Sequence, residues 1–180
     1  MTSNLSATHK HPASLWVLSL IFALFMWTFG GLIASLVIFL KQDLHIPTEH
    51  AYGLFGAYAS LMWTLPLIGG FLAGKIGHKP ATGVGLLFVL IGMLLLMVHN
   101  LFFTYLGLAA YVTGNAFFTP GLWCLIDFCY EKNDKRREAG FTLFYMCFNV
   151  GAILGIFIGG YLSSHVGFGA AFGLNAVLLI

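Results

Sequence analysis

Tyr145 and Asn149 place a hydroxyl and an amide four residues apart inside a long uncharged segment, Ala139–Ser164. In a helix, this spacing puts both side chains on one face. A buried amide needs hydrogen-bond partners. Asn149 therefore either bonds a neighbouring helix or lines a cavity, and the sequence leaves both interpretations open.

Three more side chains lie at comparable depth in other apolar segments: Trp63, Thr119 and Trp123. Together with Tyr145 and Asn149, they are our predicted substrate-binding residues. Plain packing is the alternative interpretation of both tryptophans. No lysine or arginine lies in the middle of an apolar segment, and Asp127 only touches the end of one. We expect a structural or interfacial role for Asp127, because a charge in the centre of a membrane is costly.

The sequence shows no residue set for enzyme, metal or cofactor chemistry. Cys124, Cys129 and Cys147 lack metal-ligand spacing, and their odd number argues against a disulfide framework. No Ser/His/Asp or Cys/His arrangement indicates a nucleophilic enzyme. We therefore predict a protein that is not an enzyme and that needs no metal and no cofactor.

Membrane helices are the elements that must position these side chains. The 180 residues are 59% hydrophobic and 8% charged, whereas a soluble domain has about 25% charged residues. The net charge of +2, without a basic stripe, argues against nucleic-acid binding. We therefore expect the lipid bilayer to be the partner of this chain, with all-α structure inside it.

Six apolar segments follow a polar N-terminal tail, residues 1–12, which we place in the cytoplasm. We predict helices over about residues 13–40, 51–73, 80–98, 101–127, 139–164 and 168–180, all in one transmembrane domain, 13–180. The last segment is too short for a bilayer core of about 30 Å. We therefore expect that the sixth helix is truncated and that the chain is a fragment.

Basic residues are unevenly distributed over the loops. If the N-terminus lies inside, Lys41 is the basic residue of the outer side. The inner side then holds Lys10, Lys75, Lys79, Lys132, Lys135, Arg136 and Arg137. This asymmetry predicts a cytoplasmic N-terminus.

Small residues and prolines indicate how the helices pack. Gly151, Gly155 and Gly159 recur at four-residue spacing, which predicts a face that another helix approaches closely. Pro66 and Pro120 each remove a main-chain N–H from the interior of an expected helix. We expect both prolines to kink their helices.

Two stretches resemble a known family. Gly69–Lys79, GGFLAGKIGHK, resembles the loop signature Gly-x-Leu-Ala-Asp-Arg-x-Gly-Arg-Lys of the major facilitator superfamily. Gly114–Ala152 is similar to the proton-dependent oligopeptide transporter family, which has GNGLFK in helix 4 and Phe-Tyr-x-x-x-Asn-x-Gly in helix 5. The helix 5 signature is filled here by Phe144, Tyr145, Asn149 and Gly151.

The resemblance implies the N-terminal six-helix half of a major facilitator fold, in the inner membrane of a bacterium and crossing it several times. It implies a peptide or other small-molecule substrate, whose binding site is formed jointly with a C-terminal six-helix half that is missing here. It also implies a gating loop between the second and third helices, formed by Gly70, Gly74, Lys75, Gly77 and Lys79.

The charged residues of the family pattern are replaced in this sequence. Phe22, Phe25 and Met26 stand where the family has the acidic and basic residues tied to proton coupling. Thr119 stands where GNGLFK has its lysine. A peptide carboxylate would therefore meet uncompensated desolvation in this half.

We thus predict a transporter that resembles proton-coupled di- and tripeptide symporters but has lost these residues, and that is inactive as a fragment. Two alternatives stay open. One is a facilitator or carrier of a non-peptide solute without proton coupling. The other is a non-transporting, degenerate or sensor-like membrane protein.

Overall fold

The computed structural model describes residues 11–131 and 134–179, and their regular structure is α-helical. The helices are α1 (Ala13–Gln42), α2 (Thr48–Ile76), α3 (His78–Leu96), α4 (Leu101–Asp127), α5 (Arg137–His165) and α6 (Phe168–Val177). The first five are long and apolar enough to cross a membrane, and α6 is a shorter apolar helix.

Polar residues extend some helices beyond the predicted apolar segments. Helix α2 runs from Thr48 rather than from residue 51, because the chain becomes helical directly after Pro47. Helix α4 has the predicted bounds, and the side chain of Asn100 caps its start by accepting a hydrogen bond from Phe102 N (2.9 Å). Some of the predictions fall outside the described residues. These are most of the N-terminal tail, the basic residues Lys10 and Lys132, and the end of the sixth helix at residue 180.

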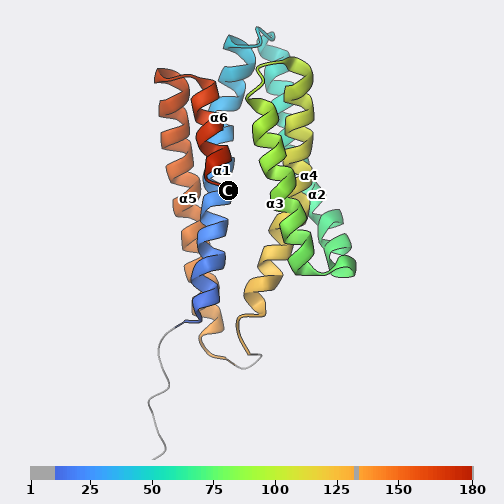
Figure 1. Ribbon diagram of the computed structural model, residues 1–180, viewed down its shortest axis with the longest axis vertical. Coiled ribbons are helices and arrows are strands. Elements are labelled where there is room, and N and C mark those ends of the chain that lie inside the picture. The colour runs from blue at the N-terminus through green and yellow to red at the C-terminus, as the bar shows by residue number, and fades with distance from the viewer. Residues whose placement is uncertain (1–10, 132–133, 180) are drawn as a thin grey trace, which may run out of the picture.

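The helices pack as two groups of three, seen on the two sides of the bundle in Figure 1. Helix α1 packs along α5, and α6 contacts both; helix α4 packs along α3, and α2 contacts both. Aromatic rings join the two groups. Phe25 of α1 and Phe118 of α4 are fully buried, with ring centroids 4.5 Å apart.

The glycine stripe of α5 lies against α1, as its spacing predicts. A Cβ atom at Gly155 would lie 2.1 Å from the main-chain oxygen of Trp27, and one at Gly151 would lie 2.1 Å from that of Ala23. Because any side chain would force the two backbones apart, glycine is required at both positions. This close approach fixes α1, which forms one wall of the candidate site described below.

Basic residues lie in or beside both connections at one end of the bundle, and we call this end the basic end. Helices α2 and α3 join through Gly77, whose φ of 97° suits glycine. Helices α4 and α5 are joined by an ion pair between Asp127 and Arg137. In the loop between them, hydrogen bonds from Arg136 hold the pKa of the Asp134 carboxyl below its usual value.

The opposite end of the bundle is tied together by a histidine. His99, in the connection between α3 and α4, pairs with Asp43 at the end of α1. Its ring also lies edge-on to Phe39, with centroids 5.6 Å apart. Phe39 in turn contacts the rings of Phe168 and Phe172 in α6 (5.4 and 5.1 Å). One cluster therefore holds α1, α6 and the α3–α4 connection together.

Candidate functional site

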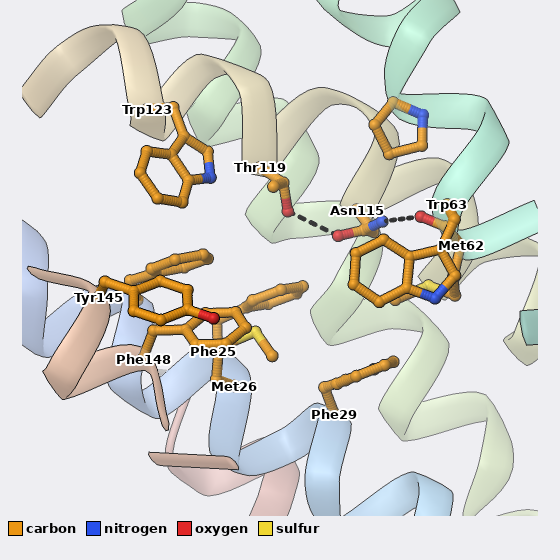
Figure 2. A pocket seen from close by; sticks show the side chains of 12 residues that line it. Phe25, Met26, Phe29, Met62, Trp63, Asn115, Thr119, Trp123, Tyr145 and Phe148 are labelled. Carbon is orange, nitrogen blue, oxygen red and sulfur yellow. Dashed lines mark hydrogen bonds between the residues drawn. The ribbon is translucent and has the colours of Figure 1, made fainter. Parts of the chain in front are cut away.

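A cavity of about 310 Å³ lies between α1, α2, α4 and α5. Each of these four helices contributes side chains to it. The lining residues are Phe22, Phe25, Met26, Phe29, Met62, Trp63, Pro66, Asn115, Thr119, Trp123, Tyr145 and Phe148. Ten of them are labelled in Figure 2. None of the twelve carries a full charge at neutral pH, so the cavity is apolar and aromatic.

The α1 wall of the cavity packs against an aromatic ring of α5. Phe22 stacks on Phe144 of α5 with ring centroids 4.7 Å apart, and both rings are buried. Trp123 of α4 meets Phe144 edge-on at 4.9 Å. These ring contacts hold the aromatic side chains from behind, so the wall is formed before any solute arrives.

Two polar side chains of the cavity, Thr119 and Asn115, form a hydrogen-bonded chain from α4 to α2. Thr119 Oγ1 donates to Asn115 Oδ1 (2.6 Å), and Asn115 Nδ2 donates to the main-chain oxygen of Met62 (2.9 Å), as Figure 2 shows. Pro66 explains why that oxygen accepts a side-chain donor. An ordinary residue at position 66 would donate its N–H to Met62 O, and proline has none.

Asn115 was not among the residues predicted from the sequence. It is 5% exposed and bridges two helices, so it is the best-placed amide at the cavity. The signal was present in the sequence as two facts that had to be combined. Pro66 leaves a carbonyl of α2 without its main-chain donor. Asn115 lies four residues before Thr119 on α4, so these two side chains share a helix face.

Four of the five predicted substrate-binding residues line this cavity: Trp63, Thr119, Trp123 and Tyr145. The fifth, Asn149, does not belong to the lining. Its Nδ2 donates to the main-chain oxygen of Tyr145 in its own helix (2.7 Å). Asn149 therefore lies half-buried beside the cavity with one of its N–H groups already bonded.

The predicted gating-loop residues lie away from the cavity. Gly70 is in α2, where a Cβ atom would contact the Pro120 ring at 3.2 Å. Gly74 and Lys75 are in the last turn of α2, and the Lys75 ammonium lies 4.5 Å from the centre of the Phe71 ring. Past the Gly77 turn, Lys79 faces a separate hollow of about 450 Å³ beside α1 and α4.

Among the residues that the structure describes, no group of three or more histidine, cysteine or acidic side chains could hold an ion. The three cysteines are all half-buried free thiols.

With this architecture in place, comparison with known families matches residues 16–180 to the Major Facilitator Superfamily. The chain belongs to that superfamily. Its fold is the N-terminal six-helix half of the superfamily's architecture, as predicted, and the protein crosses the membrane several times.

Within the superfamily, the predicted similarity to the proton-dependent oligopeptide transporter family is confirmed. The chain is 32% identical over 177 residues to dipeptide and tripeptide permease A of Escherichia coli (strain K12), covering 95% of the chain and 35% of the permease. It is 30% identical to the permease of the same name from Serratia proteamaculans (strain 568), covering 98% and 37%. The chain thus spans little more than a third of these relatives.

Solved structures give the same result. A peptide transporter of the POT family in complex with sulfate has a TM-score of 0.91 and 26% identity, over 96% of this chain and 36% of that one. A POT family transporter in complex with a thioalcohol-conjugated peptide has a TM-score of 0.90 and 25% identity, over 96% and 37%.

Proposed function

We propose that this chain is the N-terminal half of a membrane transporter for small peptides or peptide-like solutes. The proposal rests on the cavity, because four transmembrane helices converge on it. It is lined by four of the side chains that were predicted from the sequence. The relatives named as dipeptide and tripeptide permeases support it. Trp63, Thr119, Trp123 and Tyr145 are the proposed contacts to the substrate, with Asn149 beside them.

A second six-helix domain is the proposed partner. Large apolar side chains of α2 and α5 are strongly exposed, including Trp63 at 72%, which lines the cavity, and Phe157 at 72%. Transporters of this fold place the substrate between two halves near the middle of the membrane, and access alternates by rocking of one half against the other. The second domain would supply the opposite wall of the cavity.

The basic end of the bundle is the proposed cytoplasmic side. Lys75, Lys79 and Arg137 lie at this end, whereas Lys41 lies at the other. Basic loop residues are retained on the cytoplasmic side during insertion. The N-terminus would then be cytoplasmic, because α1 begins at the basic end, where His11 Nδ1 hydrogen-bonds Tyr130 Oη (2.9 Å).

One observation favours a second function, a facilitator without proton coupling. The α1 wall consists of Phe22, Phe25, Met26 and Phe29, and these side chains cannot take up a proton. Proton coupling would then depend on groups outside this wall. Uptake that persists after an uncoupler collapses the proton gradient would support the facilitator, and abolished uptake would contradict it.

The experiment for the main proposal fuses this chain to the second half of the Escherichia coli permease that it resembles. Uptake of labelled Ala-Phe is measured in a strain without peptide transporters. We expect uptake above that of the empty vector and competition by excess unlabelled dipeptide. A fusion that is present in the membrane and monodisperse after extraction, yet takes up no peptide, would refute the proposal.

A further inference from the structure

The cavity presents aromatic surface to an incoming solute from two sides. Seven of the twelve lining side chains are aromatic. Two of them are strongly exposed and come from different helices: Trp63 of α2 (72%) and Tyr145 of α5 (54%). In Figure 2 both side chains extend toward the space between them, above Phe25 and Met26 of α1. Such surfaces favour a flat apolar group, because aromatic rings prefer offset and edge-to-face contacts.

The polar chain restricts what kind of polar group can be bound. Thr119 Oγ1 already donates its proton to Asn115 Oδ1 (2.6 Å), so toward the cavity this hydroxyl has lone pairs to offer. One N–H of Asn115 is committed to Met62 O. Thr119 therefore suits a solute N–H better than a solute oxygen.

Among the lining residues, a carboxylate meets only neutral donors, the Tyr145 hydroxyl and the indole N–H groups of Trp63 and Trp123, and no cation. It would lose its hydration shell against Phe, Met and Trp side chains, and no lysine or arginine lines the cavity. Lys75 and Lys79 face elsewhere, the first over the Phe71 ring and the second in the separate hollow at the basic end. An uncharged amide escapes most of this cost.

We propose that this half of the site binds an uncharged aromatic group with an amide N–H beside it, and that it rejects a carboxylate. The ring lies between Trp63 and Tyr145, and the N–H donates to Thr119 Oγ1. This inference rests on the proposed transport function, because it names the part of a peptide-like solute that faces this half.

Three matched probes test the selectivity: N-acetyl-phenylalaninamide, N-acetyl-phenylalanine and N-acetyl-alaninamide. The first is aromatic and uncharged, the second differs by a carboxylate, and the third lacks the ring. Binding to the 180-residue chain in lipid nanodiscs is measured by saturation-transfer NMR, with empty nanodiscs as the blank. We expect the first probe to bind at least about tenfold more tightly than either of the others. Equal binding of the carboxylate, or no binding of any probe, would overturn the inference.

Two threonine variants test the assigned contact. Thr119→Val removes the acceptor and keeps the shape, and we expect about fivefold weaker binding of N-acetyl-phenylalaninamide. Thr113→Val is the matched control on the same helix, since Thr113 Oγ1 bonds Ala109 O (2.8 Å) and lies outside the cavity lining. The control should bind like the unmodified chain. Equal affinities of all three proteins would refute the role of Thr119.

The fusion with the permease half separates this inference from the proposed function. Uptake of Ala-Phe by the fusion, together with a preference of the 180-residue chain for the carboxylate probe, would overturn the inference and leave the transport function intact. Selective binding of N-acetyl-phenylalaninamide without any peptide uptake would refute the transport function while supporting the selectivity.

Discussion

At the scale of single residues, the polar chain from Thr119 through Asn115 to Met62 links the candidate site to the fold. It supplies Met62 O with a donor in place of the main-chain N–H that Pro66 lacks. A buried carbonyl left without a donor costs stability, so Asn115 serves the architecture as well as the cavity. Thr119 depends on Asn115 for the direction of its hydroxyl proton.

We expect Asn115→Leu to destabilise the chain by about 1–3 kcal/mol, because Met62 O loses its donor. Adding Pro66→Ala should restore part of that loss, since an alanine at this position would supply a main-chain N–H to the same oxygen. Unfolding in increasing SDS, followed by circular dichroism, measures both effects.

The matched control for this pair is Asn149→Leu. Asn149 bonds a carbonyl of its own helix and is half-buried, so its loss should cost clearly less. If both leucine variants lose the same stability, or if Pro66→Ala gives no recovery in the double variant, the assigned role of Asn115 is wrong.

At the scale of elements, the glycine stripe of α5 decides how closely α1 approaches and thus where the aromatic wall lies. We expect Gly155→Ala to destabilise the chain by about 1–3 kcal/mol, because the added Cβ would overlap Trp27 O. The same SDS titration measures this loss. Gly160→Ala in the same helix is the control: its Cβ would lie 3.9 Å from that of Ala34. The control should be neutral or slightly stabilising, and equal losses would contradict close packing as the cause.

The ion pair of Asp127 and Arg137 joins the ends of α4 and α5. Both side chains are more than two-fifths exposed, so we expect each single neutralisation, Asp127→Asn or Arg137→Gln, to cost less than about 1 kcal/mol. The exchanged pair Asp127→Arg with Arg137→Asp should recover stability relative to the Asp127→Arg variant alone. Thermal unfolding at low and high salt checks this. A double variant as unstable as that single charge reversal would show that the pair is not a direct contact.

At the scale of the whole molecule, the described residues form one wall of the proposed path, and the proposed second domain would supply the other. We expect the 180-residue chain alone, in proteoliposomes, to take up labelled dipeptide no faster than empty liposomes. Uptake above that background would contradict this expectation. Chemical crosslinking in the same liposomes would then show whether two copies of the chain supply both walls.

The membrane class, the six apolar segments and the similarity to peptide transporters could all be predicted from the amino-acid sequence. These follow from hydropathy and from local signatures such as Phe144, Tyr145, Asn149 and Gly151, which need no knowledge of packing. The close contact of α5 with another helix was likewise readable from the spacing of Gly151, Gly155 and Gly159.

Only the tertiary structure decided which side chains meet. Trp63 and Tyr145 share a cavity because α2 and α5 flank α1 and α4. Hydropathy does not predict which helices are neighbours. The same holds for Asn115, whose partner lies 53 residues away in α2. Asn149 matches a family signature, yet its amide turns to its own helix. The chemistry of the site depends on contacts between distant segments, which packing alone establishes.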